Sequence, residues 1–244
     1  MKTLTLAAAV LGAATLLTGC GGDDDSGNGG GSAGDSSFTD QSAKEIADTA
    51  REAMAGLESV RVDGSITSDG QEIALDLAVS TAGECAGTVS IGGASAELLG
   101  TDGTAWFKPS DEFWTAQAGE QAQTIIDLVA GRWVVMPADD DSFGEFCNLN
   151  SLLEELVDSD DEGSYEKGDV SEIDGTEAIA ITNTDQEDGP SVGHVQVDGD
   201  HYLLKVERTE GDDQGSITFS DFNEEVPVEV PAEEDIVDLN QLGS

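Results

Sequence analysis

Apolar residues recur along the chain with two different periods, and each period predicts a different kind of element. Helical spacing is found in residues 40–58, 120–130 and 149–157. The first of these begins with the capping-box pattern Ser42-x-x-Glu45, and the third follows an asparagine cap, either Asn148 or Asn150. Elsewhere every second residue is apolar, which predicts strands at 59–68, 72–79, 85–91, 94–99, 104–108, 132–135, 169–173, 176–183, 192–197, 202–208 and 215–222.

Turn signals separate these strand patterns. Six Asp-Gly dipeptides, a pair typical of hairpin turns, begin at residues 63, 69, 102, 174, 188 and 198. Asp63-Gly64 lies inside a strand pattern, where it indicates a bulge or a kink. The order of helix, strands, helices and strands predicts an α+β fold. We expect one strongly curved antiparallel sheet, with the helices packed on one side because their apolar faces must meet the apolar face of the sheet.

The N-terminus carries an export signal. Lys2 precedes an uncharged run, residues 4–17, that is too short to span a bilayer. The run ends in Leu17-Thr18-Gly19-Cys20, which resembles the lipobox of bacterial lipoproteins at all four positions. The resemblance implies that residues 1–19 are removed and that Cys20 carries diacylglyceryl and acyl chains such as palmitate. An ordinary signal peptide with a chance cysteine is the alternative.

Composition divides the mature chain into three parts. Residues 21–37 contain only Gly, Asp, Ser, Asn and Ala, so residues 20–38 are predicted to be the lipidated cysteine and a flexible tether. Residues 39–230 are long enough for one domain. Residues 231–244 form an acidic tail. We therefore expect a lipid-anchored protein on the outer, extracytoplasmic face of the cell membrane.

The net charge limits the partners. With 52 acids against 9 bases the formal charge is −43. Such a chain repels nucleic acid and anionic lipid headgroups, so no nucleic-acid partner is expected. The acids are spread along the chain, which favours a solvated, self-repelling surface; a cation store or a docking face for a basic partner are the alternatives.

Two cysteines are left once Cys20 is lipidated. Cys85 and Cys147 would lie in an oxidising compartment, where a pair of cysteines usually forms a disulfide. A metal or redox pair is the alternative, but the chain has no Cys-x-x-Cys and its two histidines are His194 and His201. We therefore predict a disulfide.

The order and spacing of several segments resemble actinobacterial lipoproteins of the LppX/LprG type. These segments are residues 58–64, 85–89, 105–108, 113–114, 131–134 and 146–149, within a region from about 42 to 225. Members of this family share the fold of the periplasmic carrier LolA, a half-open antiparallel barrel with helices across its mouth and an apolar cavity inside. The resemblance implies helices on the concave side of the sheet, and the binding of lipids or acylated molecules.

The residues predicted to line such a cavity are apolar and come from strand and helix patterns. Aromatic residues make up only 5% of the chain, yet all three tryptophans fall within residues 106–133. Core packing and strand ends are the favoured interpretation of this cluster, and an apolar lining near a cavity mouth is the functional alternative. The candidates are Leu75, Leu77, Val89, Trp106, Trp114, Ile125, Ile126, Val129, Trp133, Leu152 and Leu153.

The chain shows no recognisable catalytic set. It has no Gly-x-Ser-x-Gly motif and no phosphate loop, and the two histidines are expected to be surface strand residues, so we predict neither an enzyme nor a cofactor beyond the acyl chains on Cys20. Acids at alternate positions resemble a twelve-residue calcium loop, but positions 5 and 12 carry the wrong acids and a solvated loop is favoured over a metal site. The residues concerned are Asp158, Asp160, Glu162 and Asp169.

The sequence thus predicts a monomeric, membrane-anchored, exported lipoprotein that binds a lipid or other hydrophobic ligand, with transfer of that ligand as a further role. The alternative is a non-enzymatic interaction or sensor module of the cell envelope, whose core is filled by its own side chains. A cavity of a few hundred Å³ would distinguish the two.

Overall fold

More of the described residues lie in strands than in helices. The computed structural model describes residues 37–68, 70–136, 146–157, 164–184, 189–211 and 214–238, which belong to one compact unit. The helices are α1 (Ala43–Ala55), α2 (Asp111–Ala118), α3 (Ala122–Val129) and α5 (Leu149–Val157), with short 3₁₀ turns at Phe38–Asp40, Gly119–Gln121 and Glu233–Asp235. The strands are β1 (Ser59–Ser68), β2 (Gln71–Ser80), β3 (Cys85–Ile91), β4 (Ala94–Thr101), β5 (Thr104–Pro109), β6 (Trp133–Met136), β7 (Tyr165–Ile173), β8 (Thr176–Asn183), β9 (Ser191–Gln196), β10 (Leu203–Arg208), β11 (Gly215–Ser220) and β12 (Ile236–Val237).

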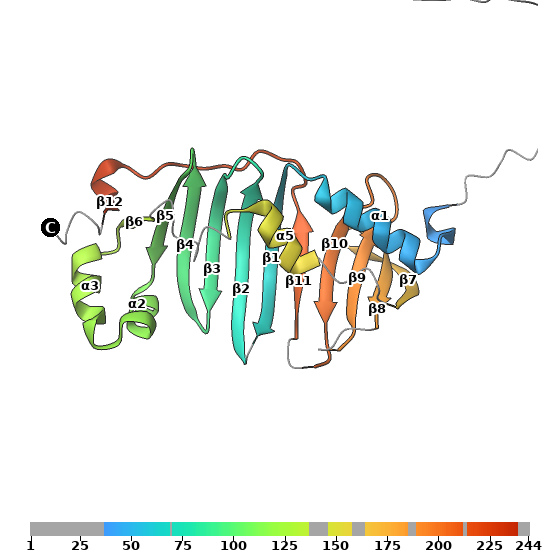
Figure 1. Ribbon diagram of the computed structural model, residues 1–244, viewed down its shortest axis with the longest axis horizontal. Coiled ribbons are helices and arrows are strands. Elements are labelled where there is room, and N and C mark those ends of the chain that lie inside the picture. The colour runs from blue at the N-terminus through green and yellow to red at the C-terminus, as the bar shows by residue number, and fades with distance from the viewer. Residues whose placement is uncertain are drawn as a thin grey trace, which may run out of the picture. The chain divides into compact units, whose positions relative to one another are not determined.

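All twelve strands join one sheet, in the order β12-β6-β5-β4-β3-β2-β1-β11-β10-β9-β8-β7 (Figure 1). Neighbours are antiparallel except β12 and β6, which are parallel. The edge strands β7 and β12 do not pair with each other, so the large curved sheet is not closed. The predicted α+β class and antiparallel meander are confirmed.

Glycines inside the strands allow neighbouring backbones to approach closely. β1 runs through Gly64 and pairs with β2 and β11 without a register shift, so Asp63-Gly64 is neither a turn nor a bulge. The φ angle of Gly64 is +145°, and a Cβ atom there would lie 2.1 Å from the backbone oxygen of Ser216. Gly87 is similar, with φ +155° and the backbone oxygen of Asp76 at 2.0 Å. Such positions let a sheet bend where a side chain would prevent it.

The core lies on one face of this sheet. Val62, Leu77, Leu98 and Phe107 occupy matching positions on β1, β2, β4 and β5, and all four are buried. They form one hydrophobic cluster with apolar residues of α1, α2 and α5. Figure 1 shows α5 in front of the middle of the sheet and α1 in front of the end that holds β10, β9, β8 and β7, whereas α2 and α3 lie near the end that holds β6. None of the described helices is long and apolar enough to cross a membrane.

The N-terminus of α1 has the predicted capping box. The Ser42 hydroxyl accepts a hydrogen bond from the backbone N–H of Glu45, at 3.3 Å. In return the Glu45 carboxylate accepts hydrogen bonds from the Ser42 hydroxyl, at 2.6 Å, and from the Ser42 backbone N–H, at 2.9 Å. These hydrogen bonds, the hydroxyl's first, hold the pKa of Glu45 below its ordinary value. The box fixes where the first helix begins.

Replacing Ser42 with alanine is expected to lower the free energy of unfolding by about 1 kcal/mol at neutral pH. A carboxylate whose pKa is lowered by folding stabilises the folded state above its ordinary pKa, which is 4.5 here, and this contribution is lost as the pH falls through the lower value. The difference between the two proteins should therefore shrink in acid. Urea unfolding at neutral pH and at a pH well below that ordinary pKa measures it. Ser95→Ala, on an exposed position of β4, is the control, and an equal difference at both pH values would contradict the prediction.

Three segments differ from the sequence-based expectation. Helix α2 was not predicted; it begins at the cap Ser110, whose hydroxyl accepts a hydrogen bond from the backbone N–H of Phe113 at 3.2 Å. β7 begins at Tyr165, before the predicted strand 169–173. β12, at Ile236–Val237 within the predicted tail, forms one edge of the sheet. These elements carry little apolar periodicity because they lie at the margins of the sheet.

Candidate binding site

A pocket of about 270 Å³ lies between α1 and α5. Its most buried walls are Met54, 1% exposed, and Leu153, 8% exposed, both of which belong to the hydrophobic core. The exposed residues Ala55, Asn150 and Glu154 form its rim. Arg51 and Val157 complete the described lining, which is mainly apolar. The arrangement suits an apolar chain that enters between the helices and leaves a polar group outside.

Helix α1 and the edge strand β7 together hold the one base of this lining. The Arg51 guanidinium donates hydrogen bonds to the Asp48 carboxylate, at 2.9 Å, and to the Tyr165 hydroxyl, at 3.1 Å. Lys44 binds the same carboxylate at 3.0 Å. Partial burial raises the pKa of Asp48, but the hydrogen bonds from Lys44 and Arg51 outweigh it and lower the pKa overall. Asp48 therefore stays ionised and keeps Arg51 in place.

Helix α5 is attached to the sheet at its first turn. The side-chain oxygen of Asn148 accepts a hydrogen bond from the backbone N–H of Ser151 at 3.1 Å, so Asn148 rather than Asn150 is the cap. The adjacent Cys147 forms a disulfide with Cys85 of β3, with the two Cα atoms 5.2 Å apart. The predicted disulfide is present, and it fixes one end of the helix that forms a wall of the pocket.

Five of the predicted cavity residues belong to the hydrophobic core cluster. Leu75, Leu77 and Val89 are buried on the core face of β2 and β3, in the same cluster as Leu152 and Leu153. Of these five, Leu153 lines the pocket. The other four are buried core residues and are not among the described lining of the pocket.

The aromatic cluster predicted from residues 106–133 is divided between the two faces of the sheet. Trp106 pairs with Leu99 and Val135 and points to the face of the sheet opposite the core residue Phe107. Trp133 lies on the same outer face as Trp106. The Lys108 ammonium lies 5.4 Å from the Trp133 ring centre. Because side chains alternate along a strand, these two tryptophans do not reach the space between α1 and α5.

The remaining candidates lie around α2 and α3. Trp114 packs edge-on against Phe107 and Phe113, at ring separations of 6.3 and 5.7 Å. Helix α3 contacts α2; its Val129 is buried and its Ile125 and Ile126 are half-buried. None of these residues is among the described lining of the α1–α5 pocket. They stabilise a separate helical pair near β4.

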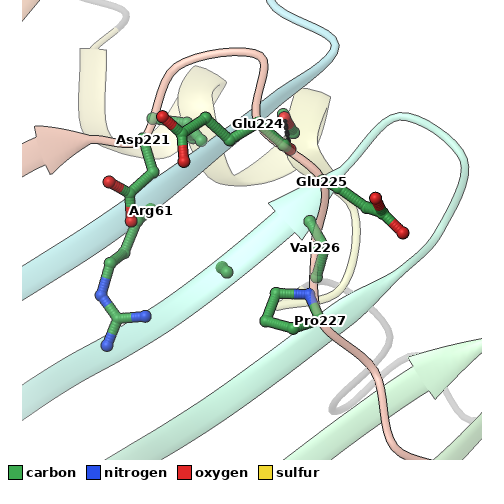
Figure 2. Close-up of a pocket in the computed structure, with 9 residues that line it drawn as sticks. Arg61, Asp221, Glu224, Glu225, Val226 and Pro227 are labelled. Carbon is green, nitrogen blue, oxygen red and sulfur yellow. Dashed lines mark hydrogen bonds between the residues drawn. The ribbon is translucent and has the colours of Figure 1, made fainter.

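A second, smaller pocket of about 160 Å³ lies on the outer face, where the chain leaves β11. Figure 2 shows the segment 221–227 crossing above the strands, with Glu225 pointing away from Arg61. The Asn223 side chain accepts a hydrogen bond from the backbone N–H of Glu58 at 2.7 Å, and the Arg61 guanidinium pairs with Asp76. Within the mixed polar and apolar lining, the Ser59 hydroxyl donates a hydrogen bond to the backbone oxygen of Glu224, so this pocket is a joint between the C-terminal segment and β1.

The metal and lipidation predictions fall mostly outside the described residues. This applies to Cys20, Asp158, Asp160 and Glu162. Asp169 lies inside β7, so it cannot close a twelve-residue calcium loop. Among the described residues no group of three or more His, Cys, Asp or Glu side chains could hold a metal ion.

The two histidines are not simple surface residues. His194 is buried, with its Nε2 atom 3.1 Å from a carboxylate oxygen of Glu207. A hydrogen bond from Lys205 and another from His194 lower the pKa of Glu207 against the opposing effect of burial. His201 stacks on Phe38, with ring centres 3.8 Å apart. Both therefore have packing roles, and His201 holds the start of the folded region against the sheet.

Comparison with known proteins identifies the fold. No protein-family model matches the chain, and no curated protein sequence matches it. Its structure is similar to that of LprF from Mycobacterium bovis, with a TM-score of 0.55 and 17% identity over 78% of this chain and 97% of LprF. For the lipoprotein LppX from Mycobacterium tuberculosis the TM-score is 0.49, with 17% identity over 77% of this chain and 98% of LppX. The likeness to LprF confirms the predicted resemblance at the level of the fold.

Proposed function

We propose that this protein is an extracytoplasmic lipoprotein that binds the apolar chain of a lipid or acylated molecule between α1 and α5. The pocket between these helices carries the proposal, because its deep walls, Met54 and Leu153, are apolar and its exposed rim is polar. The LprF-like fold and the lipobox pattern ending at Cys20 support it. The protein would act as a monomer, without performing a reaction.

A whole lipid requires more room than this pocket offers. Its volume of about 270 Å³ is just below the lower end, roughly 300 Å³, of pockets that hold drug-sized molecules. The disulfide fixes the start of α5, whereas Val157 ends the helix on the pocket's far side. We infer that α5 moves away from α1 at that end when a longer chain enters. In this reading the sheet is the half-open barrel, and α1 and α5 cover its concave mouth.

Filling the pocket tests the proposal. Ala55 is exposed and lines the pocket, so Ala55→Trp places an indole in its mouth without replacing a core residue. A fluorescent monoacylglycerol should bind this variant at least about tenfold more weakly, because the loss of a buried chain segment removes more than about 1.4 kcal/mol. The matched control is Ala116→Trp on the exposed side of α2, which should bind normally. Equal affinity of the two variants would contradict the site.

The second candidate function is an interaction or sensor module whose core is filled by its own side chains, and one observation favours it. The side chains under the pocket are well packed, with Leu77 and Val79 fully buried. Native mass spectrometry of the exported protein, together with titration of the fluorescent monoacylglycerol, distinguishes the two functions. An absence of bound acyl species and of probe uptake would favour the filled module.

A further inference from the structure

Bases are scarce in this protein, and those that the structure describes are already engaged. Lys2 lies outside the described residues, and the other eight of the nine lysines and arginines all contact groups of the same chain. Lys44, Arg51, Arg61, Lys108 and Lys205 bind carboxylates. Arg132 donates to the backbone oxygens of Leu128 and Val129, Lys167 donates to those of Thr39 and Gln41, and Arg208 is engaged as well.

These contacts hold the fold together, so the bases are not free for a ligand. Lys167 bridges β7 to the segment before α1, with distances of 2.7 and 2.9 Å to the two backbone oxygens. Lys108 joins β5 to β4 through Glu97, at 2.9 Å. An anionic ligand would have to displace an internal partner, and the partner would then be left without its counter-charge. The chain carries 52 acids, so its long-range field repels anions as well.

The mouth of the α1–α5 pocket shows the same electrostatics at short range. Arg51, the one base of its described lining, is held by Asp48 and Tyr165. Glu154, the one acid of that lining, is exposed and makes no hydrogen bond or ion pair to another described residue. A polar group leaving the pocket therefore meets an unneutralised carboxylate and a guanidinium that is already paired.

We propose that this pocket takes amphiphiles whose polar end carries no negative charge, and that it discriminates against anionic ones with the same chain. The inference deepens the proposed function and rests on it. Apolar burial is the same for both kinds of ligand, so the polar end decides between them. A neutral headgroup, such as a glycerol ester, can hydrogen-bond to Asn150 without meeting repulsion. An anionic headgroup meets Glu154 and the field of the whole protein.

The test compares three ligands with one twelve-carbon chain below their micelle-forming concentrations: monolaurin, dodecyltrimethylammonium and laurate. Displacement of the fluorescent monoacylglycerol from the full soluble domain, at neutral pH and low salt, gives each affinity. We expect monolaurin and dodecyltrimethylammonium to bind at least about tenfold more tightly than laurate. In about 1 M sodium chloride, where the Debye length is about 3 Å, the difference should fall to a fewfold.

Glu154→Gln removes the local part of the repulsion. The ratio of monolaurin affinity to laurate affinity should fall severalfold in this variant. Glu177→Gln, an exposed residue of β8 outside the pocket, changes the net charge equally and should leave both affinities unchanged. Laurate binding as tightly as monolaurin to the unaltered protein would overturn the inference but keep the proposed function. If none of the three ligands binds, the proposed function itself fails, and the inference fails with it.

Discussion

The Cys85→Ser, Cys147→Ser double variant is expected to unfold with about 4 kcal/mol less free energy than the oxidised wild-type protein. The disulfide joins residues 62 positions apart in the sequence, and opening a loop of that size returns a large conformational entropy to the unfolded chain. For a domain of ordinary stability, about 5–15 kcal/mol, this loss removes a major part of the total. Urea unfolding of both proteins under oxidising conditions measures the difference.

The local packing around Cys85 indicates that the loss of unfolding free energy has two causes, the missing bond and the newly buried serine hydroxyl. Cys85 is fully buried in the core, and Gly100 lies so close that a Cβ atom there would be 2.9 Å from the Cys85 sulfur. A serine at this site buries a hydroxyl, so a second double variant, Cys85→Ala with Cys147→Ala, separates that penalty from the loss of the bond. Both double variants should remain attached to the membrane. Rapid labelling of both thiols in the native exported protein, or a difference below about 1 kcal/mol, would contradict the prediction.

The strands of the central sheet could be predicted from the sequence because their signals are local. In β2, Leu75, Leu77 and Val79 face the core while small or polar residues alternate with them, and short turns connect β2 to its neighbours. A strand with one buried face gives this clear period of two. The first half of β7 gives no such signal, and only its second half, 169–173, is predicted, because Glu166–Glu172 are exposed along an edge of the sheet. Its start at Tyr165 depends on pairing with β8, which the sequence does not display.

The pocket was harder to predict than the sheet. The candidates were chosen because they are apolar, which selects core residues such as Leu77 and only one residue of the pocket, Leu153. The rest of the wall includes Arg51, Asn150 and Glu154, which no apolar criterion would select. Which residues line the pocket depends on the spacing and rotation of α1 and α5 on the sheet, and these are tertiary properties. The helical pattern of α5 itself was the available signal.

The assignment of the tryptophans shows a related limit. Trp106 and Phe107 are neighbours in the sequence, yet they point to opposite faces of β5. Clustering within residues 106–133 therefore says nothing about a shared cavity. Phe107, rather than Trp106, faces the core, since it is in register with Leu98 and Val134. The register of the strands, once known, decides which of Trp106 and Phe107 faces the core.

Replacing Cys20 with alanine is expected to move the protein from the membrane fraction to the soluble fraction while leaving ligand affinity unchanged. Acyl chains contribute about 0.8 kcal/mol per buried CH₂ group, so two or three of them hold a protein firmly to a bilayer, and nothing in the proposed pocket depends on them. The experiment replaces residues 1–19 with a secretory signal that ends in Ala-x-Ala, so that cleavage does not require the lipobox. Intact mass confirms the new N-terminus.

The same variant separates ligand binding from transfer. The predicted tether, residues 21–37, has a root-mean-square reach of about 20–25 Å, so an anchored domain stays near one membrane surface. If the protein passes its ligand on locally, delivery of the fluorescent monoacylglycerol to acceptor vesicles should fall when the anchor is lost, because the effective concentration at that surface falls. The anchored Ala116→Trp protein serves as the control. A Cys20→Ala protein that stays in the membrane fraction would contradict lipid anchoring, and one that transfers normally from solution would contradict a role for the anchor in transfer.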